Sequence, residues 1–195
     1  MNIDWRRMEP TTTTKIGFRT LITKHFLLPN GKQEEYVTKE KEGSTAQAVI
    51  ALTPENSVIL AKQFRVGPEK IMYELPGGGR ESGETPEQAV RRELREETGY
   101  EVGDIVPLGM IYKDAYTNTT WHYFFATHCT PTIKGQQLDE TEFIEPVLVT
   151  IDELFELGRS AQMTDTEALF LAHNVLQSIN EGASNNATTN ESNHH

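Results

Sequence analysis

Three glutamates with helical spacing are the side chains of this sequence best suited to chemistry. Glu93, Glu96 and Glu97 stand at positions i, i+3 and i+4, so a helix brings their carboxylates to one face. Carboxylate oxygens are the ligands that hard divalent cations such as Mg²⁺ and Mn²⁺ prefer. The alternative is a solvated helix face, on which arginines and glutamates one turn apart pair with each other. The spacing predicts one or the other.

A run of glycines precedes these glutamates. Gly77, Gly78 and Gly79 follow the apolar segment 71–75 and Pro76, and without side chains they let the backbone approach its neighbours closely and adopt positive φ. Carbonyls of such a loop can join a metal shell, and its amides can face an anion. Because a glycine triplet by itself is typical of any loop, the information lies in its spacing from the glutamates.

That spacing matches a known pattern. Five residues separate Gly78 from Glu84, and seven more lead to the run 92–100, which reads Arg-Glu-Leu-Arg-Glu-Glu-Thr-Gly-Tyr. The whole stretch resembles the box of the Nudix hydrolases, with Tyr100 where that family usually has an aliphatic residue. The resemblance implies an α+β fold, in which an α/β/α sandwich with a mixed sheet carries an N-terminal antiparallel hairpin. It also implies hydrolysis of a nucleoside diphosphate linked to another group.

The resemblance assigns roles to individual residues. A diphosphate repels nucleophiles, and bound Mg²⁺ or Mn²⁺ neutralises its charge. The implied metal ligands are the Gly77 carbonyl and the carboxylates of Glu93, Glu97 and Glu142. The implied catalytic residues are Arg92, which would hold a box carboxylate through a charge-assisted hydrogen bond, together with Glu96 and Glu140.

An acidic segment further along the chain supplies two of these residues. Residues 138–144 read Leu-Asp-Glu-Thr-Glu-Phe-Ile and resemble an acidic loop of the ADP-ribose pyrophosphatase branch of the family. By that resemblance Glu140 is the general base, which needs to lie within hydrogen-bond reach of the attacking water, and Glu142 is linked to the metals. The alternative is an exposed acidic turn without a catalytic role.

Two other segments resemble the same branch. Residues 62–65 (Lys-Gln-Phe-Arg) precede residues 74–78 (Glu-Leu-Pro-Gly-Gly), and residues 28–31 (Leu-Pro-Asn-Gly) form the turn of a hairpin. In that branch the arginine binds substrate phosphate, a task its planar fork suits. The hairpin often mediates a homodimer and offers an aromatic side chain, here Trp5, Phe26 or Tyr36, to stack on the base. The implied substrate-binding residues are Trp5, Phe64, Arg65, Arg80 and Tyr116.

Two other functions remain open from the sequence. Residues 112–116 lack the proline that ADP-ribose hydrolases of this branch often carry, and Tyr116 stands 16 residues beyond Tyr100. A tyrosine near that position is a marker of diadenosine polyphosphate hydrolases. A module that senses ADP-ribose without cleaving it is a third possibility, although such modules have degenerate boxes and this box retains every carboxylate.

Local signals predict the elements that position these residues. Thr85, Pro86, Gln88 and Gly99 indicate a capped helix over Pro86–Thr98. A second helix is expected over 165–178, with a helical turn at 151–157. The expected strands cover residues 17–28, 35–39, 45–52, 57–64, 71–75, 105–112, 120–128 and 145–150.

Composition limits the class of protein. The 195 residues carry a formal net charge of −11, which disfavours nucleic acid and anionic membranes as partners. No apolar run approaches the roughly 20 residues of a membrane helix, and Cys129 is the single cysteine. We expect a cytoplasmic protein with a flexible arm at 1–15, one domain at 16–177 and a disordered tail at 178–195.

Overall fold

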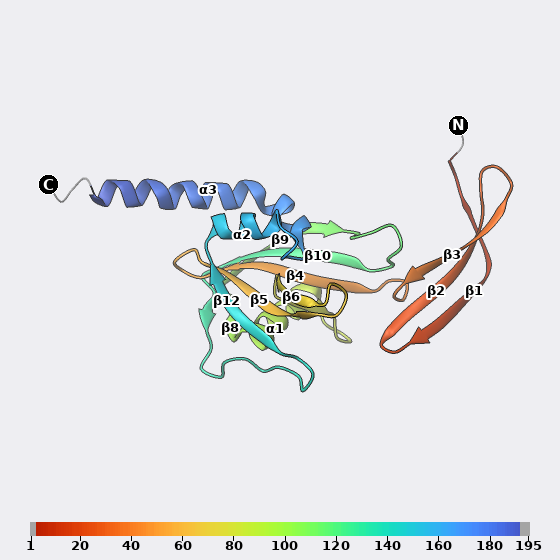
Figure 1. Ribbon diagram of the computed structural model, residues 1–195, viewed down its shortest axis with the longest axis horizontal. Helices are drawn as coiled ribbons and strands as arrows, with labels where there is room; N and C mark the ends of the chain where they lie inside the picture. Colours follow the sequence, from red (N-terminus) through yellow and green to blue (C-terminus); the bar gives the residue numbers. More distant parts are fainter. Residues whose placement is uncertain (1–2, 192–195) are drawn as a thin grey trace. The chain divides into compact units, whose positions relative to one another are not determined.

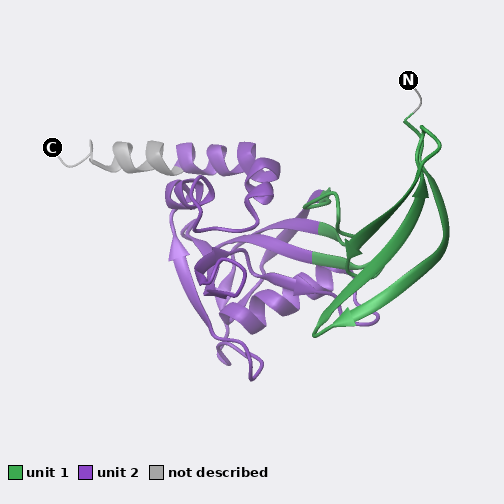
Figure 2. Cartoon of the chain, turned by 45° about the vertical axis from the view of Figure 1, so that its right-hand side comes forward, with its two compact units in different colours: residues 1–46, 110–121 green, residues 47–109, 122–195 purple. Residues whose placement is uncertain are grey.

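The computed structural model describes residues 3–191, with the side chains of residues 3–182. Figure 2 shows that the chain divides into two compact units: unit 1 comprises residues 1–46 and 110–121, and unit 2 comprises residues 47–109 and 122–195. The domain expected over 16–177 is thus shared between both units. No sequence signal marks 110–121 as a segment that returns to the first unit.

Unit 1 contains a three-stranded antiparallel sheet made of β1 (Arg6–Ile16), β2 (Arg19–Leu27) and β3 (Gln33–Lys39). The β2–β3 pair confirms the predicted N-terminal hairpin. The sequence predicts an arm over 1–15, whereas the structure has a strand there, which pairs with β2 from Arg6 to Ile16. The threonines at 11–14 are β-branched and favour a strand once a neighbour supplies the hydrogen bonds. Composition alone does not reveal that neighbour.

Unit 2 is built on a seven-stranded sheet with the order β12-β5-β4-β10-β9, to which β6 adds beside β5 and β7 beside β4. A separate two-stranded sheet joins β11 to β8. The strands are β4 (Thr45–Leu52), β5 (Val58–Arg65), β6 (Lys70–Glu74), β7 (Gly77–Gly79), β8 (Tyr100–Glu101), β9 (Asp104–Ile111), β10 (Thr120–Thr127), β11 (Thr130–Pro131) and β12 (Ile144–Val149).

Helices cover both faces of this sheet (Figure 1). Helix α1 (Pro86–Thr98) lies on one face, and α2 (Ile151–Gly158) and α3 (Thr166–Glu191) lie on the other. The α1 side chains Val90 and Leu94 are fully buried in a cluster that includes Val49 and Ala51 of β4. Since both faces of β4 are covered, its residues from Ala46 to Leu52 are all buried. The layers confirm the predicted α/β/α sandwich.

The ends of α1 follow the predicted capping. The Thr85 hydroxyl accepts a hydrogen bond from the Gln88 backbone N–H at 3.2 Å, and the Gln88 side chain accepts one from the Thr85 N–H at 2.8 Å. Gly99 ends the helix in the left-handed conformation with φ 74°. This glycine has the positive φ that other residues rarely adopt. The caps therefore fix where this helix begins and ends.

Helix α3 extends beyond the segment predicted to be helical. The sequence predicts a disordered tail from residue 178, whereas α3 continues to Glu191; residues 192–195 lie outside the described part. Ala168, Ala172 and Leu176 are all fully buried, so tertiary packing stabilises the first part of this helix. Within residues 3–191, no helix is both long and apolar enough to cross a membrane.

Candidate active site

The glutamates of α1 face the glycine strand β7. Glu97 is 6% exposed, and its Oε2 accepts a hydrogen bond from the Gly77 N–H at 2.9 Å. A Cβ added to Gly78 would lie 2.6 Å from Glu93 Oε1. The absence of a side chain at Gly78 therefore lets Glu93 approach the strand. The helical spacing and the glycines together bring both carboxylates to one place, as the sequence predicts.

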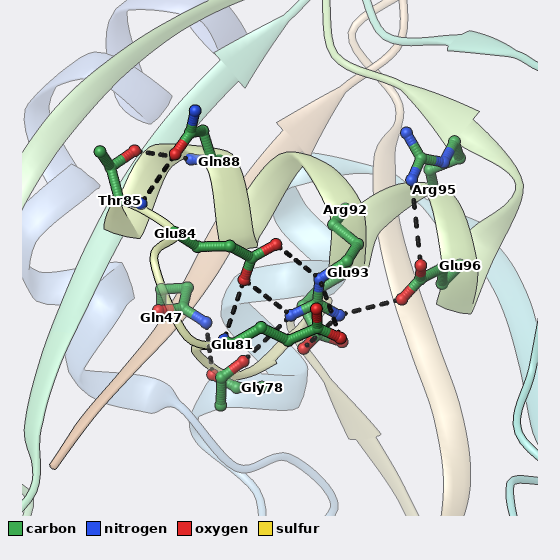
Figure 3. A network of polar contacts seen from close by, with 11 residues as sticks. Gln47, Gly78, Glu81, Glu84, Thr85, Gln88, Arg92, Glu93, Arg95 and Glu96 are labelled. Carbon is green, nitrogen blue, oxygen red and sulfur yellow. Dashed lines mark hydrogen bonds and ion pairs between the residues drawn. The ribbon is translucent and has the colours of Figure 1, made fainter.

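Arg92 is the centre of the polar network shown in Figure 3. Its guanidinium donates to Glu84 Oε1 and Glu96 Oε2, each at 2.9 Å, and lies 3.1 Å from Glu93 Oε1. A longer hydrogen bond of 3.2 Å reaches the Gly79 carbonyl. The hydrogen bond to Glu84 is the main reason that the pKa of Arg92 is raised, and it lowers the pKa of Glu84 in return. Arg92 thus fixes the loop and two box carboxylates in one arrangement.

A cavity of about 510 Å³ opens beside these residues. Its lining combines the backbone of Gly77–Gly79, the carboxylates of Glu93, Glu97 and Glu142, and the side chains of Phe64 and Arg65. Three segments predicted separately, which are the box, the 62–65 element and the acidic loop, therefore meet in one place. Glu96 is held by Arg92 instead of lining the cavity.

The cavity disfavours negative charge on its own carboxylates. Burial, followed by the charges of Glu93 and Glu142, raises the pKa of Glu97 to about 8. Burial also raises the pKa of Glu93, although Arg92 opposes this rise. Each ionised carboxylate here lacks solvation and lies near others of the same sign. A cation in the cavity would relieve both effects.

The donor set suits a hard divalent cation. Carboxylate and backbone oxygens, without thiols or imidazoles, are the ligands that Mg²⁺ and Mn²⁺ prefer. Among residues 3–182 no group of three acidic, histidine or cysteine side chains is already arranged around a single point. Glu93, Glu97 and Glu142 share the cavity lining, so the residues fit the cation in type and location.

Arg65 lies in the cavity as predicted, but its partner was not anticipated. The guanidinium Nε donates to Glu74 Oε1 at 2.7 Å, and Nη2 donates to Glu74 Oε2. Glu74 is 6% exposed. Sequence reasoning also missed Gln47, which is fully buried and donates through Nε2 to the Gly78 carbonyl at 2.7 Å. Strand register decides both contacts, and an isolated sequence carries no register signal for them.

Glu140 and Arg80 are two predicted site residues that do not line the cavity. Both are exposed, as is Glu142. Glu142, two residues beyond Glu140, does line the cavity and accepts a hydrogen bond from the Asp139 N–H at 3.0 Å. The loop thus presents Glu142 to the site in this conformation.

Trp5 and Tyr116 come together elsewhere, in unit 1. They line a cavity of about 570 Å³ that also includes Phe26 and Tyr36. The Trp5 ring lies 5.9 Å from that of Phe26 and 5.4 Å from that of Tyr36, measured between centroids. This cavity shares no residue with the one in unit 2. All three aromatic candidates for base stacking thus form one cluster.

Comparison with known proteins agrees with this geometry. The NUDIX domain family matches residues 44–171. ADP-ribose pyrophosphatase of Bacillus subtilis (strain 168) is 34% identical over 144 residues, which cover 73% of this chain and 77% of that protein. ADP-ribose pyrophosphatase of Saccharomyces cerevisiae is 27% identical over 201 residues, covering 89% and 83%. A crystal structure of an ADP compounds hydrolase shares the fold, with a TM-score of 0.73 at 20% identity, covering 89% of this chain and 97% of that one.

The chain therefore belongs to the NUDIX family. The match spans α1, the glycine strand and the cavity-lining segments, so it includes the residues on which the resemblance of the box rests. The protein is a Nudix hydrolase.

Proposed function

We propose that the protein hydrolyses the pyrophosphate bond of ADP-ribose or a related nucleoside diphosphate sugar, with Mg²⁺ or Mn²⁺, to a nucleoside monophosphate and a sugar phosphate. The observation that carries the proposal is the single cavity in which Arg65 lies beside Glu93, Glu97 and Glu142. The ADP-ribose pyrophosphatases with which the chain aligns support this substrate class. A homodimer and a cytoplasmic location are part of the same proposal and rest on the sequence alone.

Each residue then has a defined task. Glu93, Glu97 and Glu142 would hold the cation, which neutralises diphosphate charge and acidifies a water when bound. Arg65 would donate hydrogen bonds to the phosphate oxygens. Arg92 holds Glu96 and Glu93 in position. Glu140 would accept the proton of the attacking water, a role that requires its loop to turn toward the cavity.

A substrate panel tests the proposal. The purified protein is incubated with ADP-ribose, ADP-glucose and diadenosine tetraphosphate, with Mg²⁺ or with EDTA, and the products are separated by chromatography. We expect AMP and ribose 5-phosphate from ADP-ribose, only with the metal. Rapid cleavage of diadenosine tetraphosphate with inert ADP-ribose would overturn the substrate, and tight ADP-ribose binding without turnover would overturn the enzymatic role.

Two glutamates of the same helix supply matched variants. Glu97 lies in the cavity, whereas Glu87 pairs with Arg91 on the exposed first turn of α1 at 3.0 Å. Glu97→Gln should lower kcat by about two orders of magnitude or more, and Glu87→Gln should change it less than about twofold. Equal effects would contradict the assignment of the metal ligands.

A further inference from the structure

Glu74 is a buried carboxylate that the proposed reaction does not use directly. It ends β6, and its side chain is 7% exposed, whereas that of Arg65 is 46% exposed. The pair is bidentate, since Nε and Nη2 of Arg65 donate to the two Glu74 oxygens, and Gln63 Nε2 donates to Oε2 at 3.4 Å. A buried carboxylate that accepts three hydrogen bonds from two cavity-lining residues needs an explanation, because burying a charge is costly.

The register of β5 and β6 explains how the pair forms. Glu74 stands opposite Ala61, and alternation along a strand places Gln63 and Arg65 on the same face as Ala61. The Arg65 side chain therefore reaches back along the sheet to Glu74. The cavity-lining residues Gln63 and Arg65 share this face. Glu74 does not line the cavity itself, and it binds Arg65 from behind the cavity wall.

Three other carboxylates, those of Glu93, Glu97 and Glu142, line the same cavity as Arg65. Arginine readily forms bidentate pairs with any carboxylate in reach. In such a pair the guanidinium would occupy the carboxylate oxygens that are proposed to bind the metal ion. Glu74 engages only two of the five N–H groups that a guanidinium offers. The other N–H groups are those that a ligand in the cavity would use.

We propose that Glu74 is a positioning residue, which binds one edge of the Arg65 guanidinium so that the other edge faces the diphosphate and stays off the metal-binding carboxylates. The inference rests on the proposed function, because it takes a diphosphate as the ligand of Arg65. It assigns to a residue outside the Nudix box a specific effect on phosphate recognition.

A double-mutant cycle tests this in the absence of metal and turnover. Isothermal titration of the EDTA-treated protein with ADP-ribose, and separately with inorganic pyrophosphate, compares the wild type with Arg65→Ala, Glu74→Gln and the double variant. We expect each single variant to raise Kd roughly tenfold, and the double variant to bind no more weakly than Arg65→Ala. As a matched control, Glu145→Gln breaks the exposed ion pair with Lys62 (2.8 Å) on the neighbouring strand β12 and should leave Kd unchanged.

Several outcomes would overturn the inference. An unchanged Kd in Glu74→Gln would do so, as would a double variant weakened by the product of the two single effects, since Glu74 would then act independently of Arg65. If the wild type binds pyrophosphate but not ADP-ribose, the proposed substrate fails, and the cycle with pyrophosphate still decides the role of Glu74. Should Glu74→Gln fail to fold by circular dichroism, Glu74→Asp keeps the charge, is one methylene too short for both hydrogen bonds, and carries the same expectations.

Discussion

Replacing Glu97 by glutamine should stabilise the metal-free protein at neutral and alkaline pH. Glu97 is buried among other carboxylates, and its pKa is raised from 4.5 to about 8, first by burial and then by the charges of Glu93, Glu142 and Glu74. Glutamine has nearly the same shape, and its Oε1 can still accept the hydrogen bond of the Gly77 N–H. It differs from glutamate chiefly in that it never becomes charged.

The raised pKa fixes both the sign and the size of the effect. Below pH 4.5 the Glu97 carboxyl is protonated in the folded and the unfolded chain. Between pH 4.5 and about 8 only the unfolded chain loses this proton, so stability falls by up to about 1.4 kcal/mol per pH unit and then levels off. The ceiling is roughly 5 kcal/mol. We expect about 2–4 kcal/mol, because Glu93 shares part of the protonation.

Urea unfolding in EDTA, followed by circular dichroism from pH 5 to pH 9, measures this difference. The Glu97→Gln variant should differ least from the wild type at pH 5 and exceed it increasingly toward pH 8. Addition of Mg²⁺ should then stabilise the wild type and leave the variant nearly unchanged, because a ligand stabilises only the state that binds it. Two curves that run parallel across the whole pH range would refute the proposed environment of Glu97.

Two further pairs of variants test the glycine strand and the acidic loop. Gly78→Ala should lower kcat about a hundredfold, because its Cβ would lie 2.6 Å from Glu93 Oε1 and displace that carboxylate. Gly79→Ala should have a much smaller effect, because its Cβ would meet nothing within 4 Å. Equal losses of kcat in the two variants would contradict this packing. Steady-state kinetics at varied Mg²⁺ should show that Glu142→Gln raises the concentration needed for half activity about tenfold. Glu140→Gln should lower kcat by about 10²-fold or more at an unchanged metal requirement, and the reverse pattern would exchange the two roles.

The parts of the structure that local sequence determines were predicted well. Thr85, Gln88 and Gly99 act on backbone groups within a few residues of themselves, so they define α1 without any knowledge of the fold. Once α1 is defined, its 3.6-residue period places Glu93 and Glu97 on the face toward the glycines. Helical geometry alone is compatible with either a metal site or a charged surface. The resemblance to the Nudix box is what favours the metal site.

The parts that depend on partners distant in sequence were not predicted. The strand β1 forms because β2 offers it a hydrogen-bonding edge. The polar composition of this segment gives no indication of that pairing and predicts a flexible arm instead. The Arg65–Glu74 pair depends on the register of β5 against β6, since a slip by one residue would turn Glu74 to the other face. Both Glu140 and Glu142 are exposed, and which of them lines the cavity depends in the same way on how the loop between two elements folds back.

The central claim is that the carboxylates of α1 and of the acidic loop form a cation site, and direct measurement of metal binding tests it. Electron paramagnetic resonance can count free Mn²⁺ during titration of the protein without substrate. We predict saturable binding by the wild type and by Glu87→Gln, and an affinity at least about tenfold weaker in Glu97→Gln. Equal affinity in all three proteins would place the metal elsewhere and contradict the account.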